Sequence, residues 1–247
     1  MSALTLSIVI PAFNEERRLH STLDSILRWL DDSDTYRDAE VLIVDDGSRD
    51  RTAALVRARA AADPRIRLGQ YIGNRGKGYA VRHGMLQATG DWILMSDADL
   101  SAPIGELPKL MEAACRNDAA VAIGSRALDR SLIGVHQPRI REVSGIFFNW
   151  VMRRITGLPY ADTQCGFKLY RRDAAREIFP LQLLDGFGFD VEDLVIAGRL
   201  GYRVVEVPVR WNNVEGTKVS LANGLRSFGE LAVIRWNAVR GRYDRKK

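Results

Sequence analysis

The 247-residue chain is 46% hydrophobic and 27% charged with only 8 prolines, which argues against a disordered or fibrous protein and leaves room for one sizeable α/β domain. Its 2 cysteines are too few for a disulfide framework, and no apolar run approaches the roughly 18 residues that would predict a membrane span. The net charge of +5 makes an anionic partner plausible.

The first half of the chain alternates predicted strands with predicted helices. A β-branched run over residues 4–10 predicts a buried parallel strand that ends at Pro11, and a helix capped by Asn14 should follow. Further strands are predicted over 40–44, 66–70, 92–95 and 120–125, and helices over 50–62, from the 73–78 loop to about residue 89, and over 104–116. Such alternation predicts an α/β fold with a mostly parallel twisted sheet flanked by helices.

Beyond residue 126 the pattern changes. A predicted helix over 140–155 has apolar surface wide enough either for burial under a lid or for a membrane interface. The segment 225–247 resembles an interfacial helix, because it combines large apolar side chains with a basic end that anionic lipid, nucleic acid or solvent alone could cover. We therefore predict a single domain over 1–247, with a nucleotide-binding half over 1–126, an acceptor-binding half over 127–220 and a basic amphipathic segment over 221–247.

An acidic triplet, Asp97-Ala98-Asp99, follows the predicted strand over 92–95. Residues two apart on a strand point to the same side, with Cα atoms roughly 7 Å apart. Two carboxylates facing one cleft require a cation, and Mg²⁺ or Mn²⁺ takes oxygen ligands and shares them with substrate phosphates. The alternative is that Asp99 caps the next helix and Asp97 is a solvated turn residue.

A second acidic turn, Asp45-Asp46-Gly47-Ser48, ends the strand over 40–44 at the same predicted sheet edge. Its carboxylates can accept hydrogen bonds from a ribose hydroxyl or a base N–H. The alternative is a capping turn for the helix at residue 50. The chain lacks the glycine patterns of dinucleotide-binding and P-loop proteins, which argues against a dehydrogenase or a P-loop enzyme.

Together with their order, the motifs PAFNE at 11–15, DDGS at 45–48, NRGKG at 74–78, DAD at 97–99 and GSR at 124–126 resemble the family 2 glycosyltransferases of the GT-A fold. Within that family, DTQCGFK at 162–168 and FDVE at 189–192 resemble the dolichyl-phosphate β-glucosyltransferase branch. The resemblance covers most of the chain.

The resemblance implies roles for individual residues. The nucleotide-sugar site would comprise Pro11, Phe13, Glu15, Ile43, Asp45, Asp46, Lys77, Asp97, Ala98 and Asp99, with Asp97 and Asp99 holding Mg²⁺ or Mn²⁺. Arg126 and Arg141 would hold the acceptor phosphate, and Lys218 would lie near the diphosphate. Ser101 replaces a metal-binding glutamine of mannosyl-type relatives, and Asn212 replaces an arginine, which disfavours a mannosyl donor.

The implied reaction is inverting transfer of a hexose from UDP-glucose or another UDP-hexose to a polyprenyl or dolichyl phosphate. Such an acceptor is largely dianionic at pH 7 and needs no general base, whereas a sugar hydroxyl in polysaccharide or glycolipid synthesis would need one, for which Asp190 and Glu192 are candidates. Transfer from GDP-mannose is the other alternative.

The expected location is peripheral on the cytoplasmic face of a membrane. Residues 1–5 carry no basic run followed by an apolar stretch, so no secretory signal is expected. A membrane-protein partner or a second copy of the chain is an additional candidate partner. A nucleic-acid partner is not expected, because no motif resembles a nucleic-acid-binding one.

Overall fold

A seven-stranded sheet organises the protein, whose computed structural model describes residues 5–135, 139–214 and 221–245, and side chains there except at 139–143, 146 and 221–227. The strands occur in the order β3-β2-β1-β4-β7-β5-β8. Their bounds are β1 Leu6–Ala12, β2 Glu40–Asp45, β3 Ile66–Gln70, β4 Trp92–Ser96, β5 Val121–Ser125, β7 Phe167–Arg171 and β8 Val204–Pro208. All neighbours are parallel except those of β7, which runs antiparallel to β4 and β5. The predicted mostly parallel α/β fold is confirmed.

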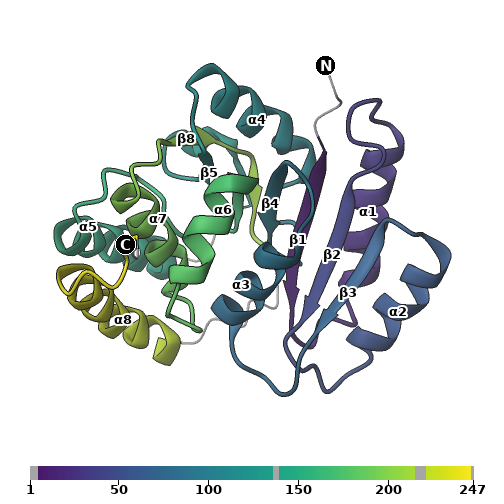
Figure 1. Ribbon diagram of the computed structural model, residues 1–247, viewed down its shortest axis with the longest axis horizontal. Coiled ribbons are helices and arrows are strands. Elements are labelled where there is room, and N and C mark those ends of the chain that lie inside the picture. The colour runs from purple at the N-terminus through teal and green to yellow at the C-terminus, as the bar shows by residue number, and fades with distance from the viewer. Residues whose placement is uncertain (1–4, 136–138, 215–220, 246–247) are drawn as a thin grey trace.

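Helices cover both faces of this sheet (Figure 1). On one face lie α1 Leu19–Asp31, α2 Thr52–Ala62 and α4 Leu107–Arg116, and on the other lie α3 Lys77–Gln87, α6 Arg172–Ile178 and α7 Phe189–Arg199. Because strand side chains alternate between faces, each face has its own apolar core. Val9 and Val44, for example, pack under α3, while Ile8 and Ile43 pack under α1.

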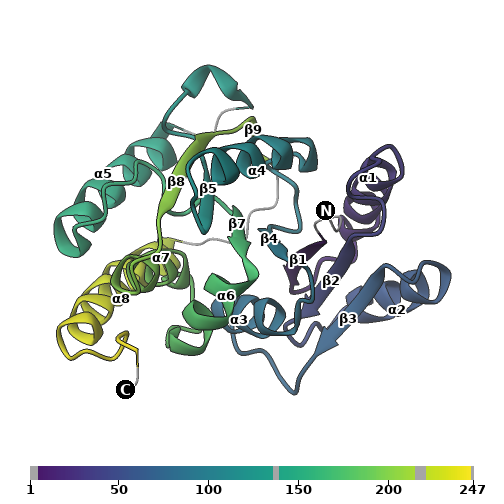
Figure 2. The ribbon, with the colours of Figure 1, turned by 45° about the horizontal axis from the view of Figure 1, so that its top comes forward.

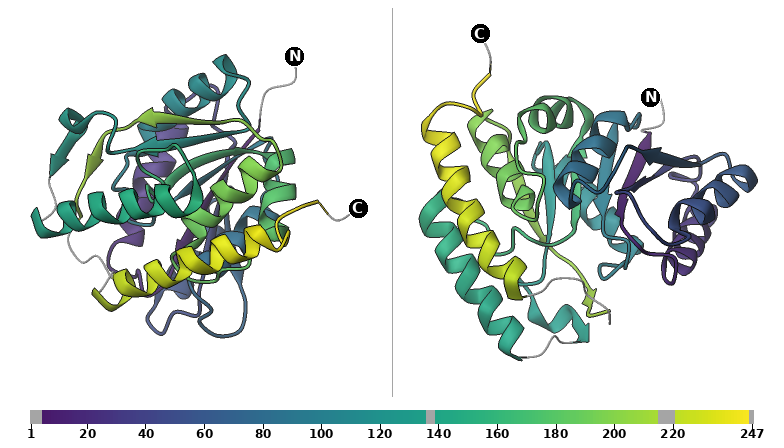
Figure 3. Two further views of the ribbon diagram at one scale, coloured as in Figure 1. Left: turned by 90° about the vertical axis from the view of Figure 1, so that its left-hand side faces the viewer. Right: turned by 90° about the horizontal axis from the view of Figure 1, so that it is seen from below.

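Two long helices, α5 Arg139–Thr156 and α8 Leu221–Val239, add a further layer at one end of the molecule. They lie side by side, with α8 also packed on α7 (Figures 2 and 3). Phe148, Met152, Leu231 and Ile234 are buried in this packing. None of the helices in the described part of the chain is long and apolar enough to cross a bilayer.

The remaining elements are short. A two-stranded sheet joins β6 Ile133–Val135 to β9 Trp211–Asn212, and single 3₁₀ turns occur at η1 Ile104–Glu106, η2 Arg130–Leu132 and η3 Phe179–Leu181. The predicted helix over 104–116 is thus a 3₁₀ turn followed by α4.

Two local predictions at the end of β1 are wrong. The strand does not end at Pro11 but continues to Ala12. Proline has no backbone N–H to donate, and this is tolerated here because β1 at Pro11 pairs only with β2 and no longer with β4. Asn14 does not cap α1, which begins at Leu19; instead Asn14 adopts a φ of 53° and its side chain accepts a hydrogen bond from Arg49 N–H.

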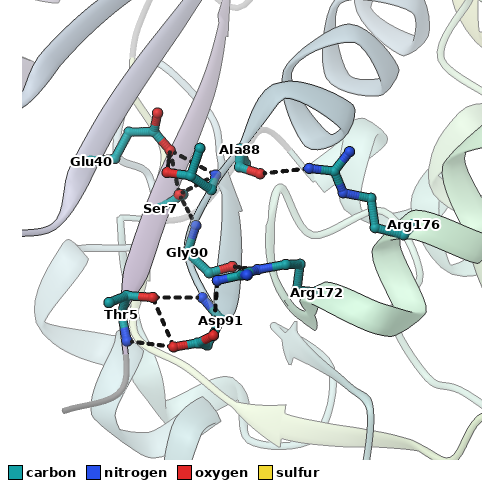
Figure 4. A network of polar contacts seen from close by, with 9 residues as sticks. Thr5, Ser7, Glu40, Ala88, Gly90, Asp91, Arg172 and Arg176 are labelled. Carbon is teal, nitrogen blue, oxygen red and sulfur yellow. Dashed lines mark hydrogen bonds and ion pairs between the residues drawn. The ribbon is translucent and has the colours of Figure 1, made fainter. Parts of the chain in front are cut away.

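The edge of the sheet where β1 and β4 begin is held by the polar contacts in Figure 4. Ser7 Oγ accepts the Gly90 N–H at 2.8 Å, and Asp91 joins Thr5 N–H (3.0 Å) to the Arg172 guanidinium (2.8 Å). Gly90 sits so close to β1 that a Cβ there would lie 2.4 Å from Ser7 N. Only glycine fits between these backbones.

Replacing Gly90 by alanine should therefore lower the free energy of unfolding by about 1–3 kcal/mol, the usual range for overpacking. Gly198→Ala is the matched control, because no heavy atom lies within 4 Å of a Cβ at that exposed position of α7. Urea unfolding of both variants tests this expectation, which equal midpoints for Gly90→Ala and wild type would contradict.

Candidate active site

The carboxyl ends of β1, β2 and β4 lie side by side at one edge of the sheet, as their registers Ala12↔Asp45 and Val9↔Met95 require. The chain order along the sheet reverses between β1 and β4. Open α/β sheets bind ligands at such an edge, in the crevice where the order reverses. The predicted motifs at 11–15, 45–48 and 97–99 all follow these strands.

The loop after β1 is tied to the loop after β2. Ser48 Oγ accepts the Asn14 N–H at 2.8 Å, and Thr52 Oγ1 accepts the Glu15 N–H at 2.8 Å. Pro11, Phe13 and Glu15 remain partly exposed at this edge. Ile43 does not: it is 0% exposed within the core under α1, so its predicted contact with a nucleoside is not supported.

The two carboxylates of the second motif have different surroundings. Asp45 is buried at the end of β2, where its oxygens accept hydrogen bonds from Ser48 N–H and Gln70 Nε2, each at 3.1 Å. A carboxylate oxygen that accepts one bond retains a second lone pair. Asp45 therefore keeps the capacity to accept a further donor.

Asp46 instead organises the loop before α3. Its Oδ1 accepts Tyr71 Oη–H at 2.8 Å and Arg75 N–H at 2.7 Å. Its Oδ2 accepts the Asn74 side-chain amide and the Gly76 N–H, both at 2.9 Å. With four donors already on its two oxygens, Asp46 shapes the loop, and its predicted direct contact with the nucleotide is not supported.

That loop places Lys77, the first residue of α3, against the acidic triplet. Lys77 Nζ lies 2.6 Å from Asp97 Oδ1. Burial disfavours the charged ammonium, but the nearby Asp97 and Asp190 outweigh it and raise the pKa of Lys77. The prediction that the NRGKG loop belongs to the same site as the triplet thus gains a direct contact.

Asp97 and Asp99 are the residues that could hold a divalent cation. Both side chains are partly exposed, and Arg18 Nη1 lies 4.0 Å from Asp99 Oδ2. Within the described ranges, no group of three or more His, Cys, Asp or Glu side chains could hold a metal. The pair of carboxylates, with cationic groups already drawn to it, fits the oxygen-donor chemistry of Mg²⁺ or Mn²⁺.

The surroundings of the triplet explain the alternative interpretation as well. Asp99 Oδ1 accepts the Ser101 N–H at 3.0 Å, so Asp99 does stabilise the turn into the next helix with one oxygen. Ala98 is nearly buried, and its carbonyl accepts a 2.6 Å hydrogen bond from Thr22 Oγ1. Ser101 and Asn212, the positions that differ from mannosyl-type relatives, are joined by an N–H to carbonyl hydrogen bond of 2.8 Å.

Arg126, just past β5, is held by Asp162. Its Nε and Nη2 donate to the two carboxylate oxygens at 2.6 and 2.7 Å, and its backbone N–H donates to the same carboxylate. Burial opposes ionisation of Asp162, but the Arg126 charge and hydrogen bonds lower its pKa. The guanidinium is thus oriented by Asp162, and it senses the charge of Asp97.

A buried lysine under the site was missed from the sequence. Lys168, the second residue of β7 and 0% exposed, places Nζ 2.8 Å from Asp190 Oδ1 and 3.4 Å from Asp193. Burial raises the pKa of Asp193 to about 7, against the opposing charge of Lys168. A lysine flanked by Phe167 and Leu169 was the available signal.

Of the two candidate bases, the structure brings only Asp190 to the site. Glu192 is buried and accepts hydrogen bonds from Leu183 N–H, Leu184 N–H and Tyr243 Oη–H. Its task is structural, and burial raises its pKa. Arg141 belongs to α5 but its side chain lies outside the described residues, as does Lys218.

The chain is similar to known proteins over most of its length. The model of the family "Glycosyl transferase family 2" matches residues 7–179. A dolichyl-phosphate beta-glucosyltransferase of Trichomonas vaginalis is 37% identical over 92% of this chain and 71% of the relative, and one of Drosophila melanogaster is 37% identical over 88% and 70%. These matches confirm the resemblance inferred from the ordered motifs.

Solved structures with the GT-A fold are also similar. Glucosyl-3-phosphoglycerate synthase from Mycobacterium tuberculosis, in complex with Mn²⁺, uridine diphosphate and glucosyl-3-phosphoglycerate, superposes with a TM-score of 0.68 at 20% identity, covering 95% of this chain and 81% of that one. At this identity the likeness establishes the fold, and that protein was solved with a divalent metal.

The four hydrogen bonds on Asp46 should hold the backbone of the loop before α3 in place. Asp46→Asn would present an amide N–H₂ to donors, so about 1.5–3 kcal/mol of charge-assisted hydrogen bonding should be lost. Amide hydrogen exchange at Arg75 and Gly76 should become faster by about tenfold or more. Asp118→Asn is the control, because the Asp118 side chain is 93% exposed; unchanged exchange in Asp46→Asn would contradict the role assigned to this carboxylate.

Proposed function

The chain belongs to glycosyl transferase family 2, and from this membership we propose that it transfers glucose from UDP-glucose, or another hexose from its UDP derivative, to a polyprenyl or dolichyl phosphate. The relatives that carry the name dolichyl-phosphate beta-glucosyltransferase support the acceptor class. The observation that carries the proposal is the convergence of Lys77, Asp97 and Asp99 at the end of β4, with the Arg126–Asp162 pair at the end of β5 and only β7 between these two strands.

On the donor side, Pro11, Phe13, Glu15 and Asp45 would bind the nucleoside, since they lie at the ends of β1 and β2. Asp97 and Asp99 would hold Mg²⁺ or Mn²⁺, which supplies positive charge to the departing diphosphate. Lys77 would exchange part of its contact with Asp97 for a phosphate oxygen, because an ammonium binds both anions as a point charge. Ala98 contributes backbone at this site.

The transfer itself needs orientation and charge. An acceptor phosphate oxygen would attack the anomeric carbon from the side opposite the diphosphate, forming the new C–O bond as the bond to the diphosphate breaks and inverting the configuration. A dianionic phosphate needs no general base. The cationic side chains must hold two anions together, a task for Lys77 and Arg126 and, as predicted from the sequence, Arg141 and Lys218.

On the acceptor side, a pocket of ≈ 680 Å³ lies next to the Arg126–Asp162 pair, between α5 and the chain leading to β7. Ala127 and Ala161, the neighbours of the paired residues, line its wall together with Trp150, Arg153 and Arg154. Apolar lining with two guanidinium groups suits an acceptor that joins a phosphate to a hydrocarbon chain. This pocket favours the lipid phosphate over a sugar hydroxyl.

The α5–α8 layer supports peripheral attachment to a membrane. Trp150 and Trp236 are each 56% exposed, Phe147 stacks beside Trp150, and Arg154 and Arg240 lie over the two indole rings. Aromatic side chains backed by arginines are typical of helices at anionic membrane interfaces. The cytoplasmic face, a membrane-protein partner or second copy, and the division at 126 and 220 stay predictions from the sequence.

A sugar-hydroxyl acceptor with Asp190 as base, or a GDP-mannose donor, is the alternative function. Asp190 is buried, and its Oδ1 lies 2.8 Å from the Lys168 ammonium, so this oxygen is already engaged by a side chain of the protein. This contact therefore favours the reaction without a base.

Donor, acceptor and metal can be tested together. With polyprenyl phosphate and Mn²⁺, the protein should transfer sugar from UDP-glucose in preference to other UDP-sugars and GDP-mannose, and chelation should abolish transfer. Asp97→Asn should lower kcat/KM by about 10²–10³-fold, as removal of a charge-stabilising group does, whereas exposed Asp34→Asn should leave it unchanged. The proposal would be overturned if no donor supported transfer to lipid phosphate. It would also be overturned if the protein transferred sugar to a sugar hydroxyl and Asp190→Asn lowered the rate of that transfer by about 10²–10⁴-fold.

Membrane attachment has its own test. Trp150→Ala with Trp236→Ala should weaken binding to anionic vesicles by at least about tenfold, because each indole contributes roughly 1–3 kcal/mol on burial in the interface. Ile72→Ala is the control, since Ile72 is 98% exposed but lies outside the α5–α8 layer. Point variants are preferable to deletion of 235–247, which would remove the fully buried Tyr243. Equal flotation of the double tryptophan variant and wild type would contradict a role of α5 and α8 in membrane binding.

A further inference from the structure

A bridge segment, residues 182–188, connects the loop that carries Lys77 to α8. The segment lies between η3 and α7 and runs directly into Phe189 and Asp190 at the start of α7. The bridge segment therefore lies next to the loop that carries Lys77 on one side and leads into the N-terminus of α7 on the other.

On its donor side the bridge is bound to the start of α3. Asp185 carbonyl accepts the Gly78 N–H at 2.9 Å, and Gln182 Nε2 donates to Gly78 carbonyl at 2.8 Å. Arg82, one turn further along α3, donates to Asp185 Oδ1 at 2.9 Å. Since Gly78 follows Lys77 directly, a shift of the bridge must move the backbone that carries the ammonium.

On its other side the bridge is bound to α8. Glu230 of α8 is buried, and its Oε2 accepts the Gly188 N–H at 2.6 Å. A Cβ at Gly186 or Gly188 would lie 2.5 or 2.7 Å from a Glu230 carboxylate oxygen, so the carboxylate fills a space that only glycine leaves open. Gly188 is also the N-cap of α7, where a negative charge is favoured by the exposed N–H groups.

The other end of the bridge segment is supported by Glu192 of α7 and by Tyr243 near the C-terminus. Tyr243 Oη–H donates to Glu192 Oε1 at 2.6 Å, while the same carboxylate accepts the Leu183 and Leu184 N–H groups of the bridge. The bridge is thus held at one end by Glu230 of α8 and at the other by Glu192 of α7, whose carboxylate also accepts the hydrogen bond from Tyr243.

We propose that Glu230 is a positioning residue for the donor site: through Gly188 and the bridge segment it sets where Lys77 and Asp190 stand relative to Asp97. The inference rests on the proposed function for the identity of the donor. A displacement of about 1 Å in a positioned group is enough to reduce a reaction rate about 10²-fold. A buried, charge-assisted hydrogen bond is strong enough to hold such a position.

The test compares Glu230→Ala, Glu230→Gln and the control Glu177→Gln. Glu177 pairs with Arg245 at 2.7 Å and so also ties the C-terminal segment to the body of the protein, but outside the bridge. Calorimetric titration with UDP and Mn²⁺ measures the donor site without any acceptor, and steady-state transfer from UDP-glucose gives kcat and KM separately.

Glu230→Ala should bind UDP about tenfold more weakly and lower kcat about 10²-fold. Glu230→Gln, whose amide oxygen can still accept the Gly188 N–H, should recover most of the UDP affinity, and Glu177→Gln should match wild type. Should Glu230→Ala fail to fold, Glu230→Gln decides: its neutral amide replaces a charge-assisted hydrogen bond by a weaker one, so exchange at Gly78 and Tyr79, whose N–H groups donate to Asp185, should be modestly faster than in wild type and in Glu177→Gln.

Wild-type UDP affinity in Glu230→Ala, or equal exchange in the fallback comparison, would overturn the positioning role while leaving the proposed function intact. Wild-type protein that binds UDP but transfers nothing to lipid phosphate would instead contradict the proposed acceptor, and the titrations would still decide the role of Glu230.

Discussion

The main physical constraint on this protein is the negative charge gathered at the carboxyl edge of its sheet. The Lys77 ammonium, 2.6 Å from Asp97, places a cation among these carboxylates. The carboxyl edge of the sheet gathers Asp45, Asp97 and Asp99, and carboxylates that share a cleft repel unless cations lie among them. Asp46 shapes the loop before α3, from which Lys77 reaches Asp97, through four hydrogen bonds. The charged edge is therefore supported by a carboxylate whose own oxygens already accept four hydrogen bonds from the protein.

The same requirement extends across the sheet. Arg126 beside Asp162 and Lys168 beside Asp190 each place a cation next to a further carboxylate, so opposite charges alternate along this edge of the sheet. In the proposed reaction, each anion of the donor or acceptor would replace a carboxylate contact of similar strength, so a site held together by charge could exchange partners. The α5–α8 layer adds an apolar, aromatic surface beside these charges, which the proposed acceptor, with its ionic head and hydrocarbon tail, would require.

Much of the fold was predictable because its signals are local. The buried strands are continuous apolar runs, and the helices that follow them have the spacing of one apolar face, so the alternation of elements and the strand-end position of the 45–48 and 97–99 motifs were recognisable without tertiary information. The errors are also local in kind. Asn14 is a residue type preferred at helix N-caps, but its side chain instead accepts a hydrogen bond from Arg49 N–H. The antiparallel direction of β7 depends on packing between distant segments, which no short stretch of sequence reveals.

The identities of the strand-end residues, and with them the family and the class of chemistry, are determined by the sequence alone, because a strand places its last side chains at the sheet edge whatever packs around it. Which carboxylates remain available to a ligand was decided only by the tertiary structure. Asp46 accepts four hydrogen bonds and the buried Glu192 three, from donors that the fold brings from elsewhere in the chain, and Ile43 is buried in the core on the α1 and α2 face of the sheet. Lys168 under Asp190 and Glu230 at Gly188 lie 22 and 42 residues from their partners, and contacts over such separations form only when β7 and α8 have packed.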